Sequence, residues 1–206
     1  IDTSNNNGWG LVVHAENMAF DSIVAAENGA YNILCRGITR CTFSDISSWR
    51  TNAGTCLRID NYPNIISADN LFGRLYLDCY GYADTCGLAI VASGNTEIYG
   101  NTFINANIER CEVGIIESSK SDTYYVHDNI FVGVHLRNCA TPYSQTVYTT
   151  GSLFLGGSTD STAFDVNGDA KFIKMGSYRT ENSGTATFSG DGTTKDFEIG
   201  AHNLIV

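Results

Sequence analysis

The sequence predicts an all-β chain wound into a right-handed parallel β-helix, and two observations lead to this fold class. Segments centred on Phe43, Phe72, Phe103 and Phe131 recur at spacings of 29, 31 and 28 residues. Each segment is followed by a polar stretch and then by a second short apolar segment. Self-similarity at such a period is typical of a solenoid, in which units too short to bury their own apolar face stack and share one core.

Short apolar runs bounded by Gly, Asn, Asp and Ser define the expected strands, and hardly any helical pattern appears. The second strands of the coils are expected at 56–59, 87–90, 113–116 and, more loosely, 146–148. Earlier turns of the same winding are expected at Trp9–His14, Ala19–Val24 and Tyr31–Leu34. We expect two or three strands per coil, with successive coils about 4.8 Å apart. A β-sandwich is the alternative, but it gives no reason for a repeat of about thirty residues.

Polar residues are expected at the corners between strands. Asn70, Asn101 and Asn129 each lie two residues before one of the repeated phenylalanines. Asparagine tolerates the left-handed backbone conformation and forms local hydrogen bonds, so we predict both features at these three positions.

Cysteine spacing predicts buried thiols rather than a metal site. The seven cysteines form no CxxC pair, and Cys79, Cys111 and Cys139 each follow a repeated phenylalanine by seven or eight residues. This spacing predicts one column of the repeat, in which each thiol packs inward as a small hydrophobe. One or two disulfides, such as Cys79–Cys86, are the alternative, and neither a zinc site nor any other metal site is expected.

A change of rhythm near residue 150 predicts two parts. Residues 1–150 are expected to form the β-helix, and residues 151–206 a small β cap or trimerisation segment that covers its open strand edges. The pair Asn167–Gly168 and the stretch SGDGTT at 189–194 are turn signals for hairpins within this second part. Because the chain starts at Ile1 without Met and ends on apolar residues, we also expect a fragment or processed piece of a longer protein.

Charge and hydropathy exclude two classes of partner. Twelve basic residues are scattered among 22 acidic ones, for a net charge of −10, whereas a duplex binder needs clustered Lys and Arg. The same acidity disfavours strongly anionic polysaccharides. No run of 18 apolar residues is present, so no membrane insertion is expected.

The coil pattern over residues 17–150 resembles the pectate-lyase-like β-helix superfamily, particularly tailspike and tail-fibre proteins of phages and prophages. The segment SGTATFSGDGTTKDFEIGAHNL at 183–204 is similar to a Gly/Thr-rich segment common in such tail proteins. This resemblance implies a homotrimer on the virion surface, in an extracellular setting, that recognises a host-surface glycan. In some members of the family it also implies glycan cleavage.

A candidate carbohydrate-binding surface follows from alignment of the coils on their phenylalanines. Four connections then fall in one lateral column, at 47–54, 78–85, 109–112 and 137–145. The third is short while its neighbours are long, so we expect a hollow there. Its floor is predicted to hold Glu109, Arg110 and Glu112, with Tyr80, Tyr82 and Tyr143 at its sides and Trp49 one coil away.

Flat aromatic rings cover the apolar face of a sugar, and carboxylates accept hydrogen bonds from its hydroxyls, so this residue set suits a glycan. Glycosidases need two carboxylates about 5.5 Å or about 6.5–9.5 Å apart, and Glu109 and Glu112 could reach either separation on a turn. They are therefore the candidates for a catalytic pair. Solvated turn residues and partly buried tyrosines are the other interpretation.

His127, Asp128 and His135 form a second candidate cluster, as a base with its orienting partner or as part of a metal site. No activated nucleophile motif accompanies them, so we expect structural corner residues. The sequence thus predicts a structural and receptor-binding segment of a trimeric tail spike or fibre, without cofactors and more consistent with a binding module than with an enzyme. A polysaccharide hydrolase or lyase on the same fold is the alternative.

Overall fold

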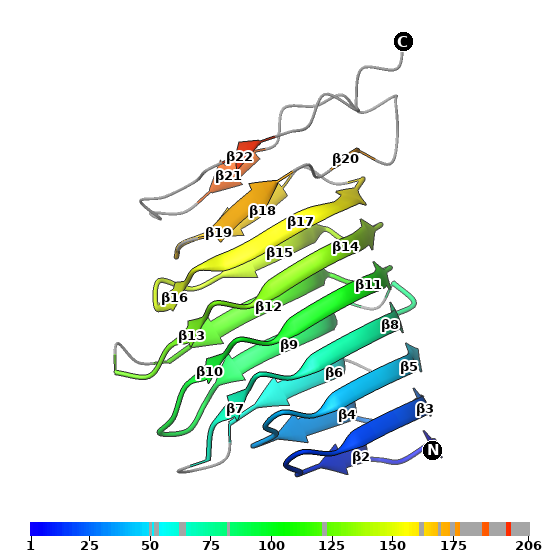
Figure 1. Cartoon of the computed structure of the whole chain (residues 1–206). Helices are drawn as coiled ribbons and strands as arrows, with labels where there is room; N and C mark the ends of the chain where they lie inside the picture. The colour runs from blue at the N-terminus through cyan, green and yellow to red at the C-terminus, as the bar shows by residue number, and fades with distance from the viewer. Residues whose placement is uncertain are drawn as a thin grey trace.

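The chain is a parallel β-solenoid in which three sheets run along one axis (Figure 1). This computed structural model describes residues 1–49, 51, 54–61, 65–81, 83–120, 123–160, 163–168, 170–173, 176–177, 187–189 and 197–198. Every ladder between the named strands is parallel, so the predicted parallel β-helix is confirmed. Within the described residues, no helix is long and apolar enough to cross a membrane.

The largest sheet, sheet A, carries the repeated phenylalanines. Its strands, in spatial order, are β1 (Asp2–Ser4), β3 (Ala19–Ala26), β5 (Thr42–Trp49), β8 (Leu71–Asp78), β11 (Thr102–Glu109), β14 (Ile130–Arg137), β17 (Ser152–Thr159), β19 (Ala170–Ile173) and β22 (Phe197–Glu198), with β20 (Gly176–Ser177) beside β17. In Figure 1 these strands rise as a staircase from the N-terminus to the C-terminal coils.

Two further sheets complete each coil. Sheet B consists of β2 (Trp9–Val13), β4 (Tyr31–Arg36), β6 (Thr55–Asp60), β9 (Cys86–Ala92), β12 (Val113–Ser119), β15 (Thr141–Gln145), β18 (Ala163–Val166) and β21 (Thr187–Ser189). Sheet C consists of the short strands β7 (Ser67–Ala68), β10 (Ile98–Tyr99), β13 (Val126–His127) and β16 (Thr149–Thr150). From β5 to β17 the chain passes repeatedly through sheet A, sheet B and sheet C, in that order. The A–B corner, where the chain leaves sheet A for sheet B, lies across the coil from sheet C.

The predicted phenylalanine column is confirmed. Phe43, Phe72, Phe103 and Phe131 are register partners on adjacent strands, and all four are fully buried. Their rings stack nearly parallel with centroids 4.7–5.0 Å apart, which matches the spacing of the coils. Phe20 and Phe154 extend the stack at its two ends. One sequence period is therefore one coil.

Left-handed residues recur at the entry to sheet A. The φ angles lie between 52° and 69° at the second position before five strands, at Asn17, Arg40, Asp69, Gly100 and Asp128, and directly before β17, at Gly151. This column turns the chain from sheet C into sheet A. The prediction of left-handed geometry at the three corner asparagines is wrong by one residue, because the residue before each asparagine makes the turn.

The asparagines themselves point inward and connect the coils. Asn70 Nδ2 donates to Asn101 Oδ1 at 2.8 Å, and Asn101 Nδ2 donates to Asn129 Oδ1 at 3.0 Å. All three are buried, so each amide satisfies polar groups that would otherwise be orphaned in the core. The predicted local hydrogen bonds are replaced by this ladder, which runs parallel to the phenylalanine column.

A second left-handed column lies in the middle of the sheet A strands, at Ser22, Asp45, Arg74, Asn105, Gly133 and Gly156, with φ angles between 52° and 67°. A left-handed residue inside a strand produces a bulge that bends it. Two successive side chains, such as those of Ser44 and Asp45, therefore face outward before Ile46 returns to the core. The sequence pattern gave no signal of this bend.

The winding continues beyond residue 150. β17 pairs with β14, β18 with β15, and β19 with β17, all in parallel. The turn at Asn167–Gly168 joins strands of two different sheets, so the predicted hairpin is wrong, and residue 150 does not end the solenoid. Most of the SGDGTT stretch and residues 199–206 lie outside the described residues, and the predicted trimerisation segment stays a prediction.

Candidate functional site

A hollow opens at the A–B corner, where the sequence predicted one. It has a volume of about 410 Å³ and is lined by Gly81, Ala83, Asp84, Arg110, Cys111, Glu112, Asn138 and Ala140. The connection at 79–85 is long, whereas those at 110–112 and 138–140 are both short. Only one long connection, 79–85, therefore borders the hollow. The predicted dip between two long connections is not formed, because the connection at 138–140 is short.

Arg110 organises the upper edge of this hollow. Its backbone is left-handed, with φ 55°, and its guanidinium turns back over the preceding coil. Nε donates to Asp78 Oδ1 at 2.9 Å, and Nη2 donates to Asp78 Oδ2. The hydrogen bond to Asp78 raises the pKa of Arg110, so the guanidinium stays charged and fixed in place.

Tyr80 stacks on this guanidinium. The Arg110 guanidinium carbon lies 4.3 Å from the centroid of the Tyr80 ring, and the Tyr80 backbone N–H donates to Asp78 Oδ1 at 2.9 Å. The tyrosine nevertheless remains 46 % exposed. A cation held over one ring face fixes the orientation of the ring and leaves area accessible to a ligand.

The two candidate acids have different neighbours. Glu109, the last residue of β11, accepts a hydrogen bond from the Tyr76 hydroxyl at 2.7 Å, which together with burial raises the pKa of Tyr76 to about 12. Glu112 accepts the backbone N–H of Asp84 across the hollow. Of the predicted floor residues, Arg110 and Glu112 line the hollow, whereas Glu109 lies against Tyr76 on the outer side of sheet A.

The other predicted aromatic residues are only partly brought together. Trp49 ends β5, is half-buried, and is the register partner of Asp78, so it lies beside the residue that holds the Arg110 guanidinium. Tyr82 lies outside the described residues. Tyr143 is fully buried and belongs to the core, so its assignment to the sugar-contact surface is wrong.

The error at Tyr143 has a structural reason. The strand lies at Thr141–Gln145, not at 146–148, and Tyr143 is the register partner of Ile115 in the interior of sheet B. Its hydroxyl donates to buried Glu117. A tyrosine thus fills a position that aliphatic residues fill in the earlier coils.

No family model matches this chain, and comparison with curated proteins and with solved structures gives no match either. The chemistry of the corner therefore follows from its own geometry. An exposed tyrosine ring, a fixed guanidinium and the Glu112 carboxylate lie around one open hollow. Such a set can cover an apolar ring face of a ligand and exchange hydrogen bonds with its hydroxyls.

The residues of the predicted histidine cluster lie on two different sheets. His127 in sheet C contacts Asp128, with Nδ1 and Oδ2 2.9 Å apart, and stacks on Tyr99. His135 lies in sheet A, where Nδ1 is 2.7 Å from Ser158 Oγ. Across the part of the chain that the structure describes, no group of three or more His, Cys, Asp or Glu residues is placed to hold a metal ion.

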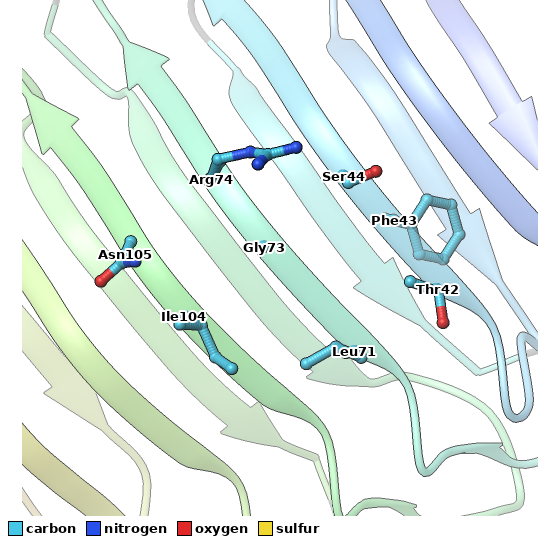
Figure 2. Close-up of a pocket in the computed structure, with 8 residues that line it drawn as sticks. All are labelled: Thr42, Phe43, Ser44, Leu71, Gly73, Arg74, Ile104 and Asn105. Atoms are coloured by element: carbon cyan, nitrogen blue, oxygen red, sulfur yellow. The ribbon is translucent and has the colours of Figure 1, made fainter.

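A second hollow, which sequence reasoning missed, lies on the outer face of sheet A. It has a volume of about 250 Å³ and surrounds Gly73, where a Cβ would meet no atom nearer than the Phe43 carbonyl oxygen at 4.0 Å (Figure 2). Leu71 and Ile104 border it in Figure 2, and Arg74 at its edge donates to both carboxylate oxygens of Asp45, at 2.6 and 2.5 Å. The sequence signal that could have found this hollow is Gly73. It has no side chain, whereas its register partners Ser44 and Ile104 on the neighbouring strands do.

Proposed function

We propose that this chain is a structural and receptor-binding segment of a trimeric, phage-like tail spike or fibre, which recognises a host-surface glycan at the A–B corner. The observation that carries this proposal is the Tyr80–Arg110 stack beside the hollow that Glu112 lines. Location on the virion surface, in an extracellular setting, belongs to the same proposal.

The arrangement suits a sugar because its parts are held in place before a ligand arrives. Asp78 fixes the Arg110 guanidinium, and that guanidinium in turn fixes the Tyr80 ring. A preorganised site loses little side-chain entropy on binding. The Tyr80 ring would cover the C–H face of a sugar, while Glu112 would accept hydrogen bonds from its hydroxyls. A net charge of −10 favours a glycan without strong negative charge.

A binding role is favoured over hydrolysis by the placement of the carboxyl groups. A glycosidase needs a carboxylic acid with a raised pKa facing its substrate. Burial raises the pKa of Glu117, but this residue is fully enclosed in the core and cannot reach an external glycan. Glu109 and Glu112 are held by different groups, Tyr76 and the Asp84 amide. A polysaccharide hydrolase or lyase is the alternative function.

Trimer formation is supported by the outer face of sheet A. Apolar side chains face outward there on four successive strands, at Leu71, Ile104, Ile130, Val132, Leu153 and Leu155. Leu71 is 39 % exposed, and the others are half-buried. Contiguous outward apolar residues are typical of an interaction surface, and the proposed occupant is a second copy of this chain.

Binding to a panel of immobilised bacterial surface polysaccharides tests the glycan proposal. At least one polysaccharide should retain the native protein, and Tyr80→Ala and Glu112→Gln should each weaken that retention about tenfold or more. Tyr99→Ala, in sheet C across the coil from the A–B corner, is the matched control and should bind normally. Equal binding by all four proteins would reject the A–B corner as the site.

The same polysaccharides separate binding from cleavage. Incubation with the native protein should release neither new reducing ends nor unsaturated uronates. Release that Glu112→Gln or Glu109→Gln abolishes would establish the enzyme instead.

A further inference from the structure

The interior of the A–B corner holds a column of sulfur atoms. Cys79, Cys111 and Cys139 are each buried at this corner, one per coil, and none of the seven cysteines, all of which the structure describes, forms a disulfide. The inward-facing free thiols predicted from sequence are thus confirmed, and the Cys79–Cys86 disulfide is not formed.

Glycine makes room for two of these sulfurs. A Cβ built on Gly87 would lie 3.2 Å from Cys111 Sγ, and one built on Gly114 would lie 3.3 Å from Cys139 Sγ. Gly87 and Gly114 occupy the same register position on β9 and β12, directly after the partners Cys86 and Val113. The second residue of these sheet B strands is therefore the neighbour of the corner sulfur.

One coil departs from this rule. Cys56 on β6 holds the register position that Gly87 holds on β9, because Thr55 pairs with Cys86. Its Sγ lies 3.7 Å from Cys79 Sγ, and both residues are fully buried. Two sulfur atoms thus meet where the later coils place one sulfur against a glycine.

The two thiols have unequal acidity. Hydrogen bonds from the Cys111 and Cys56 thiols and the Thr85 hydroxyl lower the pKa of Cys79. The hydrogen bond to Cys79 and burial raise the pKa of Cys56. Because the thiolate is the nucleophile in sulfur chemistry, Cys79 is the attacking sulfur and Cys56 the resolving one.

We propose that Cys56 and Cys79 form a redox-sensitive pair that closes into a disulfide between consecutive coils when hydrogen peroxide enters the A–B corner. The Cys79 sulfur attacks one peroxide oxygen, the O–O bond breaks, and the departing hydroxide takes up the proton of the Cys79 thiol to become water. The Cys56 sulfur then attacks the resulting sulfenic sulfur, the S–O bond breaks, and the hydroxide leaves with the Cys56 proton as a second water. Two thiols lose two electrons, and one peroxide becomes two waters.

Access and reach both suit this step. The hollow at the A–B corner is lined by Cys111, whose thiol is a hydrogen-bond partner of Cys79, so an oxidant in the hollow lies one residue away from the buried Cys79 sulfur. Side-chain rotation must shorten the contact from 3.7 Å to the bond length of about 2.05 Å. The disulfide would tie the coil of β6 to the coil of β8 and so limit separation of the two.

Peroxide treatment of the folded chain, followed by unfolding in an alkylating agent and mass spectrometry, tests the proposal. We expect two of the seven thiols to escape alkylation, with the chain lighter by two hydrogen atoms and no change in circular dichroism. Trypsin cleavage at Arg58 and Arg74 places Cys56 and Cys79 on different peptides, and chymotrypsin cleavage after Tyr80 separates Cys79 from Cys86. A Cys56–Cys79 cross-linked peptide is the expected product.

Cys56→Gly is the matched variant, because glycine is the natural neighbour of the corner sulfur in the later coils. It should form no cross-link, and a cyclic 1,3-diketone should trap Cys79 as its sulfenic acid. Cys56→Ser serves the same purpose if the glycine variant does not fold, and Cys139→Ala should keep the link. Alkylation of all seven native thiols after peroxide treatment, or a link that excludes Cys56, would overturn the proposal.

Discussion

Asn129 Nδ2 donates a hydrogen bond to Glu117 Oε1 at 2.9 Å, so the asparagine ladder ends on a carboxylate inside the coil. Ser152 occupies the position of the next asparagine, and its hydroxyl donates to the other oxygen of Glu117, as does the hydroxyl of Tyr143. Glu117 is fully buried, and three donors replace the water that it loses. The end of one interior ladder is thus also a buried group that can take up or lose a proton.

The buried Glu117 carboxyl predicts a pH dependence of stability. Burial raises its pKa in the folded chain above the ordinary value of 4.5, so the folded state keeps the proton to higher pH than the unfolded state. The stabilisation is complete below about pH 4.5 and is lost as the pH rises through the folded pKa. Compared with Glu117→Gln, the native chain should therefore lose free energy of unfolding from pH 4.5 upward.

Denaturant unfolding of both proteins at a series of pH values measures this difference. Parallel pH profiles for the native chain and the Gln variant would contradict the prediction. Glu117→Ala removes the acceptor of three buried donors and should cost at least about 3 kcal/mol at any pH.

Truncation of the phenylalanine column predicts a large loss of stability. Phe103 stacks between Phe72 and Phe131 and is fully buried, so Phe103→Ala removes contacts with two coils and leaves a cavity. We expect a loss of about 3–5 kcal/mol in the free energy of unfolding. Thr102→Ala, on the outer face of the same strand, is the control and should cost less than about 1 kcal/mol. A similar small loss for Phe103→Ala would contradict the assigned register.

The asparagine ladder gives an independent test of the interior. Asn101→Ala removes the Oδ1 atom that accepts from both the backbone N–H and Nδ2 of Asn70, and it removes one of the two donors to Asn129 Oδ1, all inside the core. A loss of about 2–4 kcal/mol is expected from these unsatisfied groups. Asn107→Ala, on the outer side of β11, should change stability by less than about 1 kcal/mol. Thermal and denaturant unfolding of the two variants provide the comparison.

The features that were predictable from sequence are those that repeat identically in every coil. Phe43, Phe72, Phe103 and Phe131 were visible as a column because stacked rings at one register require the same residue once per coil. The hollow at the A–B corner was also predictable, since it depends on the lengths of the connections 79–85 and 110–112.

Features that depend on contacts between non-identical residues were not predictable. Tyr143 replaces aliphatic residues at an interior position of sheet B, and Pro142 beside it obscured the strand. The contact between Cys56 and Cys79 requires the register of sheet B relative to the A–B corner, which no local pattern encodes. The second left-handed column of sheet A was not predictable for another reason. Ser, Asp, Arg, Asn and Gly all occur at its positions, so no single residue type marks it.

Light-scattering mass in solution tests the proposed trimer. The intact chain at micromolar concentration should have three times the mass of one chain, and the association should persist in high salt, because apolar contacts are not screened. A chain shortened after Asp160, at the end of β17, keeps the outward apolar residues of sheet A and lacks the C-terminal segment. If it remains trimeric, the contacts lie on the outer face of sheet A, and Leu153→Asp together with Leu155→Asp should then produce monomers. If it becomes monomeric, the C-terminal segment holds the trimer together. A monomeric intact chain would reject the trimer itself.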